Sequence, residues 1–261
     1  MQGKSGKGTS AGCAVAVMAK ASTPGRTKTR LVPPLSYVEA ANLNTAFLCD
    51  VAENLLSAAV LADVTGWMAY APAGSEAFFK DALPPAIGLI ETMKPDFGAC
   101  LFHAAASLLE AGHGAACLLN SDSPTLPVGC LVAAASALAA PGDRVVLGPS
   151  TDGGYYLIGL KRPHRGLFEG VEWSTERVFR QTLARCAELG LPVFELPAWY
   201  DVDDADGLRV LIGEVLDAKP FRTFGGRATA ASATRRYLSS LLETSDLAER
   251  LGRVHPSSRV A

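Results

Sequence analysis

The sequence predicts one α/β domain with a mostly parallel β-sheet and helices on both of its faces. Short apolar runs alternate with longer helical segments along most of the 261 residues, which is the pattern of such a sheet. Hydrophobic residues make up 49% and charged residues 19%, which supplies a large core and argues against general disorder. The length fits one large domain better than two small ones.

Each expected strand is a short apolar run that ends at turn residues. The first, residues 13–20 (CAVAVMAK), has the continuous apolar character of a strand buried on both faces. Further strands are expected at residues 65–71, 87–91, 115–120, 144–147, 155–160 and 193–196.

The expected helices have helical spacing of apolar residues and recognisable ends. Ser36 is suited to cap the first of them, and Gly112 and Gly190 are placed to end two others. Helices are expected at residues 36–61, 97–111, 126–139 and 175–189, with one more beginning near Asp204.

Both ends of the chain differ from this central domain, residues 13–218. Residues 1–12 form a polar lead rich in Gly, Ser and Lys, which we expect to be flexible. Residues 219–261 carry eight Lys and Arg against three Asp and Glu. Within this basic C-terminal extension, residues 234–251 suit one amphipathic helix. We expect a peripheral element that the sheet does not need for folding, with a regulatory or partner-binding tail as the alternative.

Charge and cysteine usage narrow the classes of protein. A net charge of −2 gives no reason to expect nucleic acid or anionic membrane as a partner, and no run approaches the ~20 apolar residues of a membrane span. The stretch 11–19 after Lys4 and Lys7 weakly resembles a secretory signal but suits a first buried strand equally well. The cysteines are scattered without a C-x-x-C pair, so we expect reduced thiols in a cytoplasmic protein.

Four cations follow the first expected strand within the loop 20–31: Lys20, Arg26, Lys28 and Arg30. Ligands of open α/β sheets bind beyond the carboxyl ends of the strands, so this loop is placed to meet one. Lys offers a point charge to phosphate oxygens, and Arg offers paired hydrogen bonds. The pattern therefore predicts phosphate contacts, with an ordinary solvated loop as the alternative.

Asp122 follows another buried strand, in the sequence Asn-Ser-Asp-Ser-Pro. This places a carboxylate at the same edge of the sheet as the cationic loop. Carboxylate oxygens bind Mg²⁺ or Mn²⁺, which in turn bridge the phosphates of a nucleotide. The alternative is an aspartate that only turns the chain before Pro124.

Two further segments are candidates for the same edge. Asp152, Gly153 and Gly154 directly precede a strand, where glycines let the backbone approach a ligand closely, although Asp-Gly-Gly is also a common turn. Residues 201–206 hold four carboxylates, which repel one another unless a cation or a helix N-terminus offsets them. A helix beginning near Asp204 accounts for one or two, and a metal would account for the others.

These motifs, in this order, resemble one family. K-x-x-x-P-G-x-x-K-T-R-L, S-D-x-P-x-L, G-P-x-x-D-G-G-Y-Y-L-I-G-L, W-S-T and D-V-D are similar to the bacterial glycosyltransferase-A-like transferases. That family was long labelled a domain of unknown function, and its members are often named radical-SAM- or selenium-domain-associated transferases. The resemblance covers residues 15–212. It implies a Rossmann-like nucleotide-diphospho-sugar-transferase fold for residues 13–218.

The resemblance also implies roles for particular residues. It suggests Asp122 and Asp152 as catalytic carboxylates, and Asp122 and Asp203 as ligands for Mg²⁺ or Mn²⁺. It also suggests a substrate pocket shaped by Gly153 and Gly154, and phosphate contacts from Lys20, Arg26, Lys28 and Arg30. The sequence departs from the family where Cys100 stands in place of an arginine, and where residues 203–208 make a weaker helix start.

The expected function is glycosyl transfer from a nucleotide-diphospho-sugar to a small acceptor. Nucleotidyl transfer is the close alternative, because four loop cations also suit a nucleoside triphosphate that would release pyrophosphate on reaction with a phosphorylated or phosphonate substrate. A non-catalytic nucleotide-binding module is a third possibility, which the departure at Cys100 keeps open. The sequence does not reveal the oligomeric state.

Overall fold

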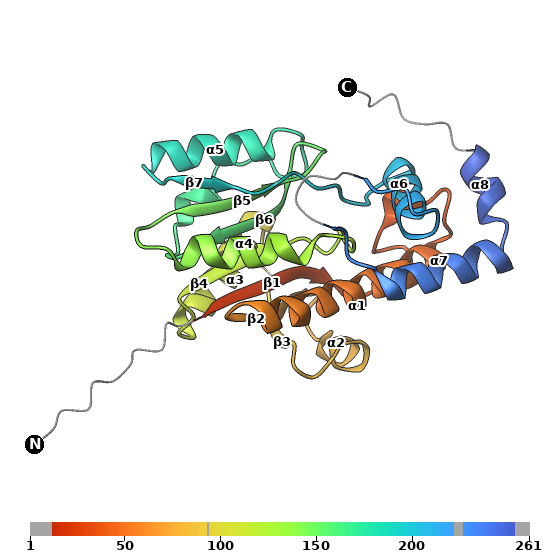
Figure 1. Cartoon of the computed structure of the whole chain (residues 1–261), viewed down its shortest axis with the longest axis horizontal. Coiled ribbons are helices and arrows are strands. Elements are labelled where there is room, and N and C mark those ends of the chain that lie inside the picture. The colour runs from red at the N-terminus through yellow and green to blue at the C-terminus, as the bar shows by residue number, and fades with distance from the viewer. Residues whose placement is uncertain (1–11, 93, 222–226, 254–261) are drawn as a thin grey trace, which may run out of the picture.

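A seven-stranded sheet forms the centre of the molecule in the computed structural model, which describes residues 12–92, 94–221 and 227–253 (Figure 1). The predicted flexible lead, residues 1–12, therefore falls outside the described residues except for Gly12. The strands are β1 (Cys13–Lys20), β2 (Val64–Ala71), β3 (Gly88–Glu91), β4 (Ala115–Leu119), β5 (Val145–Pro149), β6 (Tyr155–Leu160) and β7 (Val193–Glu195).

The sheet is mixed but mostly parallel, as predicted. Its strand order is β3-β2-β1-β4-β6-β5-β7, and only β6 runs antiparallel to its neighbours. Because β6 runs backwards, Leu157 near its start pairs with Leu119 at the end of β4. The turn between β5 and β6 consequently lies at the edge where β4 ends.

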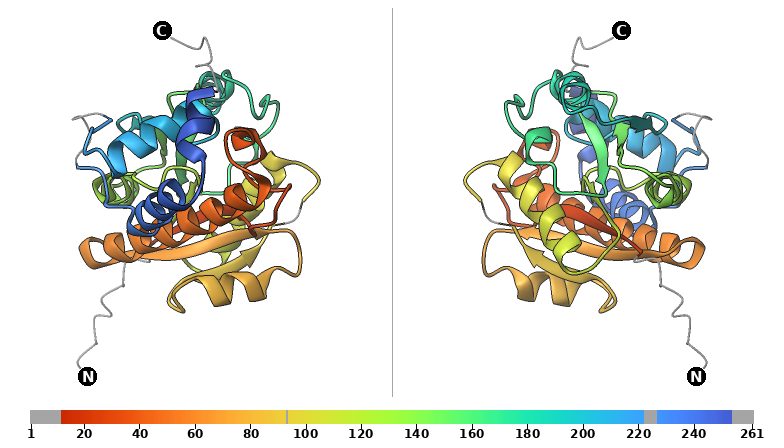
Figure 2. Two further views of the ribbon diagram at one scale, coloured as in Figure 1. Left: turned by 90° about the vertical axis from the view of Figure 1, so that its right-hand side faces the viewer. Right: turned by 90° about the vertical axis from the view of Figure 1, so that its left-hand side faces the viewer.

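Helices cover both faces of the sheet (Figures 1 and 2). One face packs against α1 (Tyr37–Leu61) and α4 (Val128–Ala139), and the other against α3 (Phe97–Glu110) and α5 (Val178–Glu188). The helix α7 (Ser232–Thr244) packs on α1 and on α6 (Ala205–Val215), and both extend the core of the first face. Ser36 caps α1 as predicted, in a capping box with Glu39. No helix in the described part of the chain has both the length and the apolar character to span a bilayer.

Short elements account for most of the differences from the predicted order. The helix α2 (Glu76–Ala82) was not predicted, although it buries Phe79 completely. Two single-turn 3₁₀ helices, η1 (Thr29–Leu31) and η2 (Arg165–Leu167), lie in segments expected to be loops. The single helix expected at residues 234–251 is two helices, α7 and α8 (Leu247–Arg253), because Ser245 is extended and interrupts the helical hydrogen bonds.

The C-terminal helices pack on the domain instead of extending from it. The helix α7 runs alongside α1 (Figure 1), and Leu238, Leu241 and Leu247 are buried in the core that covers this face of the sheet. The N-terminus of α7 begins after Ala231, which has no capping side chain. The Asp50 carboxylate of α1 supplies the cap, since it accepts hydrogen bonds from two backbone N–H groups of α7.

The helix α8 is tied to the start of α1 by charge. Arg250 donates to both carboxylate oxygens of Glu39, at 2.8 Å each, and to the carbonyl of Pro34. Hydrogen bonding from Arg250 lowers the pKa of Glu39. The expectation that residues 219–261 are dispensable does not fit this packing, and we now expect their removal to destabilise the domain.

Candidate functional site

The candidate site forms at the edge where the parallel strands β1 and β4 end. These strands are neighbours in the sheet, so the loop 21–36 after β1 and the Ser121–Thr125 loop after β4 leave it side by side. The first of these loops lies against α6 (Figure 1). This is the edge at which open α/β sheets bind ligands.

Lys28 joins the two loops to the segment before α6. Its ammonium lies 2.9 Å from Asp122 Oδ1 and 3.3 Å from Asp203 Oδ1, and it donates to the Val202 carbonyl at 2.7 Å. The ring of Phe47 is 5.4 Å away, and only 6% of the Lys28 side chain is exposed. The centre is thus a buried cation between two carboxylates, which we call the Lys28 centre.

Hydrogen bonds to the backbone join the two segments that carry the carboxylates of the Lys28 centre. The Val202 N–H donates to the Asp122 carbonyl at 2.9 Å, and the Ser123 hydroxyl donates to the Tyr200 carbonyl at 2.8 Å. The Tyr200 hydroxyl in turn donates to Glu214 of α6 at 2.6 Å. The two acidic segments are therefore fixed to each other, which restricts the positions that the Asp122 and Asp203 side chains can take.

The charges of the Lys28 centre sustain one another. Burial would lower the pKa of the Lys28 ammonium, but the carboxylates of Asp122 and Asp203 outweigh that effect and raise it. Burial would raise the pKa of Asp122, but Lys28 lowers it. For Asp203, burial and the charge on Asp122 together raise the pKa despite Lys28. The single buried ammonium thus stabilises Asp122 as a carboxylate more than Asp203.

A third carboxylate, Asp201, stands beside the Lys28 centre. Burial, followed by repulsion from Asp152, Asp203 and Asp122, raises the pKa of Asp201 to about 7. The Thr151 N–H donates to the Trp199 carbonyl at 3.1 Å, which places the turn between β5 and β6 beside the segment that leads to Asp201. Local negative charge here exceeds what one lysine neutralises.

The other predicted phosphate contacts surround the buried lysine on the surface. Lys20, at the end of β1, and Arg26 are exposed, and neither takes part in an ion pair within the described residues. Arg30 is 68% exposed in its side chain and lies 3.6 Å from Asp203. The loop itself is anchored by Asn44 of α1, which donates to the Lys20 carbonyl at 3.1 Å. The loop therefore presents three cations to solvent and commits one to the interior.

Asp152, Gly153 and Gly154 have local structural roles. The Asp152 carboxylate accepts from the Gly154 N–H at 2.8 Å and is otherwise exposed. Gly153 has a φ of +91°, and a Cβ there would lie 2.2 Å from the Glu176 carbonyl oxygen. Position 153 thus requires glycine, because any larger residue would collide with the segment that precedes α5. The predicted catalytic role of Asp152 and the predicted pocket at both glycines stay predictions.

The donor set of the Lys28 centre suits a divalent cation only in part. No group of three or more His, Cys, Asp or Glu side chains is arranged as a metal site within residues 12–92, 94–221 and 227–253. Mg²⁺ is often held by one or two carboxylates together with substrate phosphates. Asp122 and Asp203 fit that pattern, so these two residues would hold a metal that arrives with a nucleotide better than a metal alone.

Sequence reasoning gave too little weight to two residues at this edge. Asp201 was one of four crowded carboxylates, and only the fold shows that Asp204 caps α6 while Asp201 is close enough to Asp152 for their charges to interact. The side-chain oxygen of Asn120, just before the Asp122 loop, is buried and finds no hydrogen-bond partner among the described residues. Its position in an Asn-Ser-Asp run at a strand end was the available signal.

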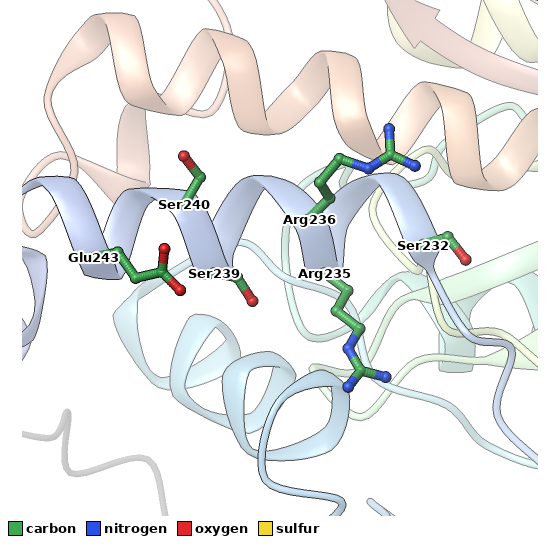
Figure 3. A pocket seen from close by; sticks show the side chains of 6 residues that line it. All are labelled: Ser232, Arg235, Arg236, Ser239, Ser240 and Glu243. Atoms are coloured by element: carbon green, nitrogen blue, oxygen red, sulfur yellow. The ribbon is translucent and has the colours of Figure 1, made fainter.

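Two surface hollows of about 470 Å³ each lie elsewhere. One is on the outer side of α7, where Arg235 and Arg236 point in different directions (Figure 3), so these two cations do not converge on one ligand. The other is lined by α6, Asp217, residues 219–221 and Leu251. None of the predicted site residues lines either hollow.

Comparison with known proteins supports a transferase-like fold. A family described as "Uncharacterized protein conserved in bacteria (DUF2064)" matches residues 55–175, a stretch that contains Asp122 and Asp152. A crystal structure from Desulfovibrio desulfuricans G20, provisionally named a nucleotide-diphospho-sugar transferase, is 26% identical. The match covers 88% of this chain and 96% of that chain, with a TM-score of 0.73. A comparison with curated proteins gives no match.

More distant structures share the fold alone. A cytidylyltransferase from Leptospira borgpetersenii serovar Hardjo-bovis is 10% identical over 94% of this chain and 99% of that chain, with a TM-score of 0.52. A CMP:2-keto-3-deoxy-manno-octonic acid synthetase, in complex with CTP, is 15% identical over 79% and 99%, with a TM-score of 0.51. The chain thus has the glycosyltransferase-A-like α/β fold, and its structural neighbours are transferases.

Proposed function

We propose that this chain transfers a glycosyl group from a nucleotide-diphospho-sugar to a small acceptor, with Mg²⁺ or Mn²⁺ bound beside the diphosphate. The observation that carries the proposal is the Lys28 centre, where a cation and two carboxylates meet at the ligand-binding edge of the sheet. The similarity to the Desulfovibrio protein supports the same class of donor.

The residues of the chain would divide the work by charge. The exposed Lys20 and Arg26 would contact the phosphate oxygens, because neither is engaged in an ion pair within the described residues. Asp122 and Asp203 would hold the divalent cation, which neutralises charge on the departing diphosphate when bound.

In the transfer, a bond forms between an acceptor oxygen and the anomeric carbon, while the bond from that carbon to the diphosphate oxygen breaks. The diphosphate keeps the electron pair, and the acceptor hydroxyl loses its proton. Asp152 is the candidate to receive that proton, since it is exposed at the rim of the same edge. Groups aimed at the charge that develops on the leaving group accelerate such a step.

Nucleotidyl transfer is the second candidate, and the cation-rich loop favours it. A phosphate or phosphonate oxygen of the second substrate would attack the α-phosphorus of a nucleoside triphosphate, and pyrophosphate would leave. Lys20, Arg26 and Arg30 are three exposed cations at this edge, and the longer phosphate chain of a triphosphate would offer acceptors to all of them.

The two candidates differ in the ligand that the site should prefer. With Mn²⁺ present, glycosyl transfer predicts tighter binding of a nucleoside diphosphate or nucleotide sugar than of the matching triphosphate in calorimetry. If the triphosphate instead binds roughly tenfold tighter, about 1.4 kcal/mol, and pyrophosphate appears on turnover, the glycosyl assignment is wrong and the nucleotidyl one replaces it. Binding without turnover of any donor would favour a non-catalytic module.

A further inference from the structure

We propose that Lys28 is a tethered counter-ion, which a divalent cation must displace from Asp122 and Asp203, so that metal and nucleotide bind together and not separately. The inference rests on the proposed function for the class of ligand, and it concerns how that ligand enters. Its basis is the position of one ammonium group.

The Lys28 ammonium has all of its hydrogen-bonding capacity in use. An ammonium has three N–H donors. Its neighbours are Asp122 Oδ1 at 2.9 Å, Asp203 Oδ1 at 3.3 Å and the Val202 carbonyl at 2.7 Å. With 6% of its side chain exposed, the lysine exchanges few contacts with water. The two carboxylates and the Val202 carbonyl thus form a complete cation site, and the Lys28 ammonium occupies it.

A divalent cation bridging the same carboxylates would need the same space. The ammonium contacts one oxygen of each carboxylate, Oδ1 of Asp122 at 2.9 Å and Oδ1 of Asp203 at 3.3 Å. Two cations a few ångströms apart repel strongly in a partly buried site. The lysine and the metal therefore exclude each other, and metal alone has to overcome the loss of the lysine's contacts.

The movable partner in this centre is the lysine. The carboxylate segments are joined by the hydrogen bonds from Val202 to Asp122 and from Ser123 to Tyr200. Lys28 instead extends from the surface loop on a flexible four-carbon stem. The backbone of Lys28 has a φ of 52°, a left-handed conformation that is unfavourable for residues other than glycine.

A nucleotide diphosphate changes the balance because it offers the displaced ammonium new acceptors. Lys20 and Arg26 are exposed on the loop that also carries Lys28, so phosphate oxygens attracted to them would approach the segment from which Lys28 extends. The metal would then lie beside the two carboxylates, the diphosphate beside the metal, and the displaced ammonium beside the diphosphate, so that each charge has neighbours of the opposite sign. Coupling of this kind is reciprocal: each ligand raises the affinity of the site for the other.

The test measures Mn²⁺ binding to the intact chain without nucleotide, by electron paramagnetic resonance of free Mn²⁺. Lys28→Met keeps an unbranched side chain of nearly the same length and removes the ammonium with its charge. We expect it to bind Mn²⁺ roughly tenfold or more tightly than the wild type. Adding Asp122→Asn to Lys28→Met should abolish the gain, which would place the bound ion between the two carboxylates.

Arg30→Met is the matched control, because Arg30 lies 3.6 Å from Asp203 without standing between the carboxylates. It removes a local positive charge, and we expect a clearly smaller gain. An equal gain in Arg30→Met would mean that general electrostatics explain the result and would overturn the proposal. Equal Mn²⁺ affinity in Lys28→Met and wild type would overturn it as well.

A second titration uses ADP, GDP, CDP and UDP, each with Mn²⁺. The lysine should assist once it is displaced, so Lys28→Met should bind the preferred pair more weakly than the wild type even though it binds Mn²⁺ alone more tightly. If Lys28→Met does not fold, Lys28→Gln, which is uncharged and keeps a polar N–H donor, permits the same comparison. A gain in Mn²⁺ affinity with no nucleotide bound by any variant would support counter-ion exchange while contradicting the proposed function.

Discussion

Two aspartates of this domain, Asp50 and Asp122, accept hydrogen bonds from partners of different kinds. Asp50 is 4% exposed, and its two oxygens accept from the backbone N–H groups of Ala233 and Thr234 at 2.8 and 2.7 Å. Asp122 meets the side-chain ammonium of Lys28 at 2.9 Å. The Asp50 partners belong to a helix end, whereas the Asp122 partners are side chains: the Lys28 ammonium and the Ser121 hydroxyl, which donates to the same Oδ1 atom at 2.7 Å.

The difference separates a structural carboxylate from one that can exchange its partner. Asp50 cannot release its partners without uncapping α7, so its charge serves the folded state. Asp122 can exchange an ammonium for another cation while the backbone around it stays in place. We expect mutations at the two centres to have separable effects, one on stability and one on ligand binding.

The largest expected effect follows from removing the whole partner of Asp50. A chain that ends at Phe221 loses α7 and α8, exposes the sites that Leu238, Leu241 and Leu247 fill, and leaves Asp50 without its partners. At about 1.5–3 kcal/mol for each buried leucine, the loss is on the order of 5 kcal/mol or more. Urea denaturation followed by circular dichroism would measure it.

Such a loss approaches the total stability of many domains, about 5–15 kcal/mol. We therefore expect the truncated chain to unfold at much lower urea or to fail to accumulate. Arg253→Ala, which removes only an exposed charge from α8, is the control and should change little. An unchanged unfolding midpoint in the truncated chain would show that α7 and α8 are independent of the core.

A smaller and more specific effect is expected from changing the charge alone. Asp50→Asn keeps one acceptor for two N–H groups, and should cost about 1.5–3 kcal/mol, the scale of a hydrogen bond to a charged group. Asp122→Asn should cost less, because Lys28 keeps Asp203 and the Val202 carbonyl. Chemical denaturation of both variants would test this order, and the reverse order would break the comparison.

The exposed cations should have a modest effect on the ligand and none on the fold. Arg26→Ala should weaken nucleotide binding by about 1–2 kcal/mol, because the residue is free to contact phosphate. The difference should shrink as salt rises, since exposed charges are screened. Calorimetry at low and high ionic strength checks both statements, and full affinity in Arg26→Ala would mean that the loop is merely solvated.

The smallest expected effect concerns pH and Glu39, in the first turn of α1. Hydrogen bonding from Arg250 lowers the pKa of Glu39 in the folded state. The stabilisation from this pair is thus complete above the unfolded pKa of about 4.3 and is lost as pH falls through the lowered folded value. Glu39→Gln should be less stable than wild type at neutral pH by at most about 1 kcal/mol. The two proteins should converge in acid denaturation.

The centre of the sheet was predictable from the sequence because strands such as β1 and β4 are buried on both faces. The run 13–20 is β1 as predicted, and every other predicted strand is present within about two residues, the usual uncertainty of element ends. The helix α2 was not predictable in the same way, because one buried residue, Phe79, anchors seven residues.

The candidate site was predictable as a set of residue types but not as an arrangement. Strand ends placed the cationic loop and Asp122 at one edge of the sheet, because parallel strands share a carboxyl edge, and the structure brings Lys28 of that loop to Asp122. Nothing local distinguishes Lys28 from Arg26, yet one is buried between carboxylates and the other is exposed. That difference depends on the segment around Asp203, which folds back across the sheet from far along the chain. The role of α7 was missed for the same reason, since its cap is supplied by Asp50 of α1.

The most direct test of the central claim is calorimetric titration of nucleoside diphosphates with Mn²⁺ into wild type, Asp122→Asn and Asp50→Asn under conditions where all three are folded. We predict metal-dependent binding to the wild type and to Asp50→Asn with similar affinity, and none detectable to Asp122→Asn. Equal affinity in Asp122→Asn and wild type would contradict the assignment of the Lys28 centre as the site that binds metal and nucleotide.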